Sequence, residues 1–344
     1  MRPTFSIIAF TVLSGTGYGL WFLIGASLLA AWPYCAMTPL AGEPAPVYVC
    51  IYSGIIATAL IAGFVLVTIG LLSSLAHLGR PSRAWRALSQ WRSSWLSREG
   101  VAALLTYLPA LALGACFLLV PSPPDSASGG GVLRFNPLVP VGPLGALLAL
   151  GALATVYCTA NIYASLKPIR AWHNRLVTPA YLLLGLYSGA LLLAALTVLP
   201  YADFGPALPV LLIAVVVLAV CCAWLKIAYW RDIDRSPTIG PGRATGLEAL
   251  GEVRSFEPPH TEENYLTHEM GFVLARRHSA RLRRIALLAG FALPALLSAI
   301  GFALPSLRLA AAWLALGSGL VGLFVERWLF FAEARHIVIA YYGR

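Results

Sequence analysis

The clearest deficit in this 344-residue sequence is charge. Only 11% of the residues are Asp, Glu, Lys or Arg, whereas 59% are apolar and the mean hydropathy is +0.78. Because soluble domains carry charge at about a quarter of their positions, this composition excludes an ordinary water-soluble domain. The apolar residues form unbroken blocks, which excludes an outer-membrane barrel built from short stretches of alternating polarity. Helices must therefore span the bilayer.

Cysteine and histidine are also scarce, with six residues of each. No two cysteines form a C-x-x-C pair, and no two histidines lie deep within the apolar blocks where they would ligate a haem iron from both sides. We therefore expect no iron–sulfur, zinc or haem site, and no cofactor held by this chain. Cys35 and Cys50 flank one short outer loop, where an oxidising compartment would allow a disulfide between them.

Eight apolar stretches reach the length of about 20 residues that a helix needs to cross ~30 Å of hydrocarbon. We expect an all-α membrane protein with a single domain over residues 1–344, a polytopic bundle of eight transmembrane helices. Gly15 and Gly19, four residues apart in the first stretch, should allow a second helix to approach closely. The stretches lie near residues 6–31, 48–77, 99–120, 141–166, 179–199, 207–230, 285–304 and 309–334.

Lys and Arg are distributed very unevenly between these stretches. One set of connecting loops contains only Arg134 and Arg308, and nearly all other basic residues lie in the opposite set. Because short positively charged loops stay in the cytoplasm, we place both termini there, together with the polar loop 231–284 between spans six and seven. This orientation also explains the net charge of +10 without any binding of nucleic acid.

The candidate functional site lies where the second span joins the third. His77 falls in the last turn of the second span, and Glu99 lies just inside the third, two residues after Ser97 as a candidate N-cap. An ionisable group costs about 2.5–3.5 kcal/mol at the centre of a membrane helix and less near its end, which makes each one a site candidate. A structural role is the alternative, because both residues complement the helix dipoles at these positions.

Quinol oxidation is the chemistry that this pair fits. Two antiparallel helices joined by a cytoplasmic turn would bring His77 and Glu99 to the same membrane depth, where the head group of a quinol lies. Removing two electrons and two protons from a quinol requires an imidazole or carboxylate that accepts a hydrogen bond from the hydroxyl and then takes its proton. The pair supplies both acceptors.

The other polar groups within the spans are few, and we expect them to form hydrogen bonds or ion pairs between helices rather than to carry chemistry. They are Tyr18, Tyr157, Asn161 and the Glu326-Arg327 pair.

Three motifs are distinctive: S-L-A-H-L-G-R-P-x-R-A-W from Ser74, S-W-L-S-R-E from Ser94 and E-R-W-L-F-F-A-E-A-R-H from Glu326. They resemble the DmsC family, the anchor subunits of DMSO-reductase-type molybdoenzymes. The resemblance implies a haem-free subunit of the bacterial cytoplasmic (inner) membrane that oxidises menaquinol or ubiquinol. Electrons would pass to an iron–sulfur subunit and then to a molybdopterin catalytic subunit.

The same resemblance assigns quinol binding to His77 and Glu99, and we include Arg80 from the first motif. The terminal substrate stays open: it could be a sulfoxide, an N-oxide or another oxyanion, and electrons could also flow in reverse into quinone. Two other functions are alternatives. One is a purely structural tether for the catalytic subunits, and the other is a small-solute secondary transporter, which the nearly uncharged middle of the spans disfavours.

Overall fold

The computed structural model describes residues 3–36, 47–76, 78, 80–119, 140–199, 207–235, 240–254, 256–257 and 274–342. In this part of the chain, eight helical segments are long and apolar enough to cross a membrane, which confirms the predicted fold class. The seventh is continuous through α8, a π-helical turn and α9. The helices are α1 (Phe5–Ala36), α2 (Val47–Leu75), α3 (Trp95–Leu119), α4 (Val141–Ala164), α5 (Val177–Thr197), α6 (Ala207–Arg235), α8 (Leu274–Leu287), α9 (Leu293–Ala303) and α10 (Arg308–Ala332).

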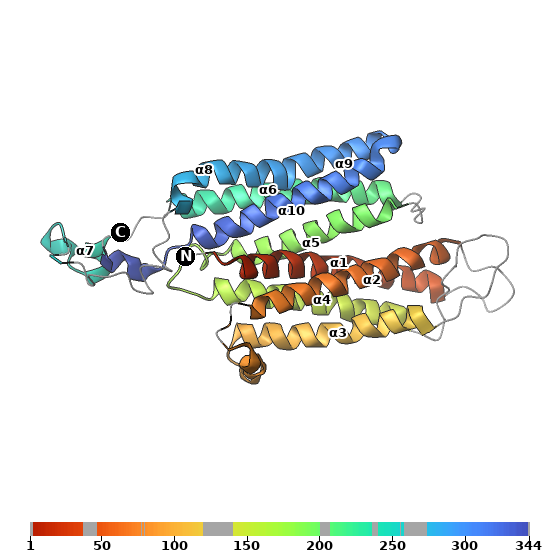
Figure 1. Cartoon of the computed structure of the whole chain (residues 1–344), viewed down its shortest axis with the longest axis horizontal. Coiled ribbons are helices and arrows are strands. Elements are labelled where there is room, and N and C mark those ends of the chain that lie inside the picture. The colour runs from red at the N-terminus through yellow and green to blue at the C-terminus, as the bar shows by residue number, and fades with distance from the viewer. Residues whose placement is uncertain are drawn as a thin grey trace.

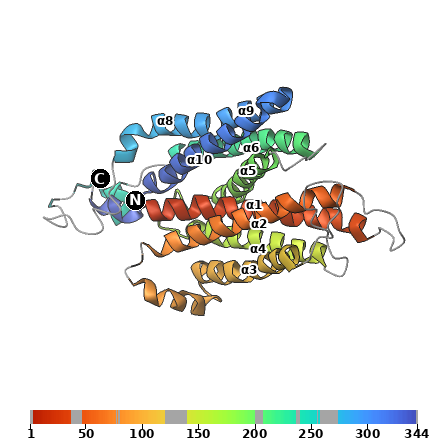
Figure 2. The same cartoon turned by 45° about the vertical axis from the view of Figure 1, so that its right-hand side comes forward.

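The helices form two groups that α5 connects. In the first group, α1 packs against α2, α4 and α5, and α3 packs mainly against α4. In the second, α10 packs against α8 and α9, and α6 lies between α5 and α9. Both views show α8, α9 and α10 on one side of α5, and α2, α3 and α4 on the other (Figures 1 and 2).

Apolar side chains cover the outside of this bundle. On α3, for example, Leu104, Leu108 and Leu111 are all exposed at spacings of four and three residues. Residues at that spacing share one face of a helix. In water such a stripe would be a liability, whereas in a bilayer it is the surface that faces the acyl chains.

The described N-terminal and C-terminal residues lie at the same end of the bundle. The beginning of α1 lies at the same end as α7 (Pro241–Thr245) and the 3-10 helix η6 (Ile337–Tyr342), as an even number of spans requires (Figure 1). The assignment of this end to the cytoplasm is the prediction from the distribution of Lys and Arg.

Within the loop expected at 231–284, α6 continues to Arg235 and α8 already begins at Leu274.

Proline explains the π-helical turn in the seventh span, which the structure places at Leu288–Ala292 (η4). Pro294 has no N–H to donate to the carbonyl of Gly290, and its ring would collide with that carbonyl in a regular α-helix. The extra residue per turn relieves the collision. The hydroxyl of Tyr187 on α5 donates a hydrogen bond to the Gly290 carbonyl over 2.7 Å. This buried carbonyl therefore has a donor although Pro294 cannot supply one.

Glycine sets the distance between α1 and α5. A Cβ atom on Gly19 would overlap the backbone carbonyl of Gly185, and one on Gly189 would overlap the backbone of Gly19. The predicted close approach is therefore confirmed at Gly19. At Gly15, α5 also comes close, because a Cβ atom on Gly185 would lie 3.2 Å from the Gly15 carbonyl oxygen, but the side on which a Cβ of Gly15 itself would lie is open within 4 Å.

We expect opposite effects from two alanine substitutions in α1. Gly19→Ala should destabilise the protein by about 1–3 kcal/mol, because the methyl group forces α1 and α5 apart. Gly15→Ala should leave stability unchanged or raise it by about 0.5–1 kcal/mol, because alanine favours the helix and the space is open. Denaturation of the purified protein in detergent measures both. Equal losses at the two positions would contradict the glycine contact between α1 and α5.

The disulfide that the sequence would allow between Cys35 and Cys50 concerns side chains outside the described residues. Four other cysteines, Cys116, Cys158, Cys221 and Cys222, are free thiols.

Candidate functional site

Glu99 points into the protein interior because of how α3 begins. Trp95 is the first residue of α3 and packs edge-on against Tyr157 of α4, with ring centroids 5.9 Å apart. Glu99 follows four residues later and so lies on the same face of the helix. Its residue exposure is only 5%. The carboxylate predicted from the sequence is therefore buried at the interface between α3 and α4.

Ser97 does not have the role that its position suggested. It lies inside α3, because the helix begins at Trp95, and so it is not the N-cap. Its hydroxyl instead donates a hydrogen bond to the carbonyl of Ala87. That carbonyl belongs to the 3-10 helix η1 (Pro81–Gln90), which connects the second and third spans. Ser97 thus ties the connecting segment to the first turn of α3, next to Glu99.

The carboxyl group of Glu99 has a hydroxyl partner and no basic one in the described part of the chain. Thr159 on α4 donates its hydroxyl to Oε1 of Glu99. No described Lys or Arg forms an ion pair with Glu99. A buried carboxylate without a cation is unfavourable for folding, and such groups concentrate at functional sites.

The other two predicted site residues are not described in contact with this carboxylate. His77 lies outside the described residues, so its pairing with Glu99 stays a prediction. Arg80 is exposed immediately before η1, and no described hydrogen bond or ion pair joins it to Glu99. The partner of α3 also differs from the expected one: α3 touches α2, but α4 is its main neighbour.

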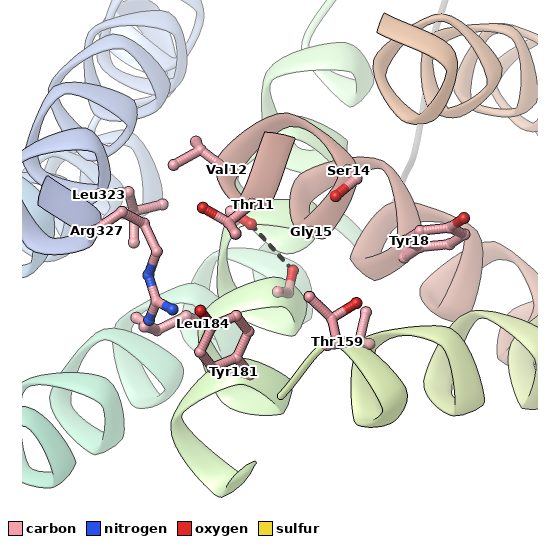
Figure 3. Close-up of a pocket in the computed structure, with 13 residues that line it drawn as sticks. Thr11, Val12, Ser14, Gly15, Tyr18, Thr159, Tyr181, Leu184, Leu323 and Arg327 are labelled. Carbon is pink, nitrogen blue, oxygen red and sulfur yellow. Dashed lines mark hydrogen bonds between the residues drawn. The ribbon is translucent and has the colours of Figure 1, made fainter. Parts of the chain in front are cut away.

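A small chamber, lined in part by hydroxyl groups and including Thr159, lies between α1, α4, α5 and α10 (Figure 3). Its volume of about 30 Å³ is enough to hold at least one water molecule. In Figure 3, Arg327 and Tyr181 lie on one side of it, and Thr159 and Tyr18 on the other. Most of its polar lining groups are hydroxyls: Thr11, Ser14, Tyr18, Thr159, Tyr181 and Ser188. Thr159 thus contacts both the chamber and the Glu99 carboxylate.

Three polar atoms at the chamber are buried without a hydrogen-bond partner among the described residues. They are the hydroxyls of Tyr18 and Tyr181 and the Nη1 atom of Arg327. Tyr18 lies close to Thr155 of α4, and Tyr181 lies close to Arg327, but neither pair has the geometry of a hydrogen bond. Since buried polar groups in native proteins nearly always have a protein or water partner, these atoms mark a place for a bound water or ligand.

An apolar cleft of about 460 Å³ adjoins the chamber. It lies between α1, α4, α5 and α6 and includes Leu153 and Trp224, whose residue exposures of 42% and 70% place them on the outer surface of the bundle. Tyr18, Val156 and Gly185 line both the cleft and the chamber. The cleft therefore extends from the outer surface of the bundle to Tyr18, which it shares with the chamber.

A buried ion cluster lies next to the chamber, and Arg327 is the member of the cluster that lines it. Glu326 on α10 pairs with Lys226 on α6 over 2.6 Å, and with its own neighbour Arg327 over 2.6 Å. This confirms the expectation that Glu326 and Arg327 form ion pairs. Lys226 was not singled out from the sequence, although a lysine in the apolar run from Ala207 to Trp230 is itself the signal, because such a residue needs a buried partner.

These features define the class of the protein: an integral, multi-pass, all-helical membrane protein with a buried carboxylate and a separate apolar cleft that opens at its outer surface. The first 121 residues match the family model described as "DMSO reductase anchor subunit (DmsC)". The whole chain is 31% identical to the C subunit of sulfite dehydrogenase from Allochromatium vinosum, over 99% of each sequence. The chain belongs to the DmsC family of membrane anchor subunits of molybdoenzyme complexes. Anchor subunits associate with catalytic and electron-transfer subunits of an oxidoreductase complex.

Proposed function

We propose that this subunit exchanges electrons and protons with a membrane quinone, and that the apolar cleft and the Glu99 carboxylate together form the quinone site. The observation that carries the proposal is that the cleft, the chamber and the Glu99 carboxylate follow one another through shared residues. The cleft begins among lipid-facing side chains and shares Tyr18 and Val156 with the chamber. Thr159, which also lines the chamber, donates a hydrogen bond to Glu99. A quinone has the matching chemistry, because an apolar ring and tail end in two oxygens that need hydrogen-bond partners.

The free hydroxyl of Tyr18 is well placed to bind one quinone oxygen, since it lines both cavities. In quinol oxidation, a carboxylate such as Glu99 accepts a proton from the quinol hydroxyl, and we assign the second proton to His77 from its place in the motif. Two electrons leave one at a time for the iron–sulfur partner and reach the molybdopterin subunit. Quinone is the product, and both protons pass to water at the cytoplasmic rim.

The same groups serve the opposite reaction, because a carboxylate that accepts a proton in one direction donates it in the other. The relative from A. vinosum is named as a dehydrogenase subunit, and in a dehydrogenase the electrons would enter the quinone. The direction of flow then depends on the substrate of the catalytic partner and not on the residues of this chain.

A pair of tryptophan substitutions on α4 tests the cleft. Leu153→Trp should weaken the binding of a quinone analogue at least about tenfold, because the indole fills the cleft and loss of a well-fitted pocket contact costs ~1–3 kcal/mol. Leu150→Trp is the matched control, because Leu150 is also exposed on α4 but does not line the cleft. Binding is measured by fluorescence quenching on the purified complex in nanodiscs, and quinol-dependent turnover is measured on the same samples.

The tether alternative predicts a different pattern. If the chain only holds its partners at the membrane, the complex should not bind the analogue, and both tryptophan variants should behave like the wild type. Binding that is unaffected by Leu153→Trp would place the quinone elsewhere and contradict the proposed site.

A further inference from the structure

The unexplained feature of the interior is a second buried cation. Lys226 alone would neutralise Glu326, yet Arg327 is buried beside the same carboxylate, with residue exposures of 2% for Lys226 and 4% for Arg327. The three side chains therefore carry two positive charges and one negative charge. Since burying a charge is costly unless it is paired, the extra cation needs a reason.

The guanidinium of Arg327 is held between Glu326 and Tyr181. Its Nε donates to Glu326 Oε2 over 2.6 Å, and its Cζ lies 4.1 Å from the centre of the Tyr181 ring. Nη1 has no described hydrogen-bond partner, and Arg327 is the only charged side chain that lines the chamber among the described residues. In Figure 3, the guanidinium lies next to Tyr181 and faces the space that Thr159 and Tyr18 border.

Acidic residues balance the extra charge on the other side, away from the chamber. Glu333, which follows α10 directly, pairs with Arg283 over 2.8 Å, and Arg283 also pairs with the exposed Asp234 over 2.6 Å. This outer set carries two negative charges and one positive charge. The network as a whole is thus neutral, but it is polarised, with its positive end at the chamber and its negative end toward the surface.

From this arrangement we propose that Arg327 is a positioning residue of the quinone site. It provides a fixed positive charge that stabilises the negative charge developing on a quinol oxygen bound at Tyr18, at the edge of the chamber. The inference rests on the proposed function. Arg327 acts through the chamber, by way of its hydroxyls and a water that fits its volume, and need not touch the quinol itself.

The proton transfer shows why the charge helps. The O–H bond of the quinol breaks, its proton bonds to the Glu99 carboxylate, and the negative charge moves from that carboxylate to the quinol oxygen. Glu99 does not line the chamber, whereas an oxygen bound at Tyr18 lies at its edge. Charge therefore moves toward Arg327 during the step, so that the guanidinium stabilises the product state of proton transfer more than the starting state.

Four variants of the intact complex test this role, with quinol oxidation as the readout. Arg327→Gln should lower kcat about 10- to 100-fold with little change in KM, somewhat less than the loss of a direct oxyanion donor. Arg327→Lys keeps the charge and should stay within about threefold of the wild type. Lys226→Met is the matched control: it also removes one cation and leaves one ion pair with Glu326, but Lys226 does not line the chamber. It should also stay within about threefold.

Gly15→Ala, the fourth variant, provides a test that does not alter the ion cluster. Gly15 lines the chamber and has room for a methyl group, which would take up part of the space that is open to water. Turnover should fall about tenfold without loss of stability. This variant keeps the inference testable if Arg327→Gln prevents assembly.

The outcomes separate the two proposals. Normal turnover in Gly15→Ala, normal turnover in assembled Arg327→Gln, or equal losses in Arg327→Gln and Lys226→Met would each overturn the role of Arg327. If Glu99→Gln slows turnover while the Arg327 and Gly15 variants do not, only this inference fails. If Glu99→Gln itself is fully active, the proposed quinone site fails with it.

Discussion

Replacing Glu99 with glutamine is expected to slow quinol oxidation by about 10²–10⁴-fold, the contribution typical of a positioned general base. Glutamine has nearly the same shape, and its amide oxygen can still accept the hydrogen bond from Thr159. The substitution therefore keeps the packing between α3 and α4 and removes only the ability to take a proton. The measurement is the rate of quinol-dependent reduction of the catalytic partner in membranes, divided by the amount of assembled complex.

Two further variants make this result specific. Glu99→Asp keeps the carboxylate but withdraws it by one methylene, so its rate should lie between those of the wild type and Glu99→Gln. Glu252→Gln serves as the matched control, because Glu252 is exposed and pairs with Arg254 outside the membrane helices. If Glu99→Gln assembles normally and turns over at the wild-type rate, the carboxylate is structural and the proposed chemistry is wrong.

Hydropathy predicted the eight spans well, because in a bilayer the apolar length of a helix is set by the hydrocarbon itself. The helix ends were harder to predict. We expected the third span to begin near residue 99 and the sixth to end near residue 230, whereas α3 begins at Trp95 and α6 ends at Arg235. Counting apolar residues stops at the first charged side chain, but a helix continues into the interface, where polar side chains reach water.

The candidate site was only partly predictable. Glu99 could be found because a carboxylate in an apolar span is rare and costly. Its partner Thr159 and the chamber residue Tyr18 could not, because threonine and tyrosine are ordinary in membrane helices. Their significance depends on which helices are neighbours. The sequence suggested the pair α2 and α3, whereas the structure sets Glu99 against α4, a contact between residues 60 positions apart.

The ion cluster shows the same limit on predicting contacts from the sequence. Glu326 and Arg327 were recognisable as a pair because they are adjacent in sequence. Lys226 is one hundred residues away, and only the packing of the second helix group brings it within 2.6 Å of Glu326. Spacing along one helix predicts which residues share a face, but it cannot predict which face of another helix lies opposite.

Replacing Glu326 with glutamine should destabilise the fold more than any of the other substitutions proposed for this chain. Glu326 is fully buried between Lys226 and Arg327, and it is the only carboxylate described in direct contact with either cation. Glutamine would leave two buried cations without an anion. Breaking a buried ion pair in this way costs about 3–5 kcal/mol. The free energy of unfolding of the purified chain in mixed detergent micelles measures the loss.

The double variant Glu326→Gln, Lys226→Met isolates the electrostatic part of that loss. It removes the anion together with one cation, so that Arg327 is the single charge left uncompensated. It should therefore be more stable than Glu326→Gln alone, with a coupling energy of ~1–3 kcal/mol between residues in direct contact. Additive effects of the two substitutions would contradict a direct interaction. A Glu326→Gln variant as stable as the wild type would mean that water, and not the carboxylate, compensates the two cations. The ion pairs of Glu326 on α10 would then not stabilise the fold.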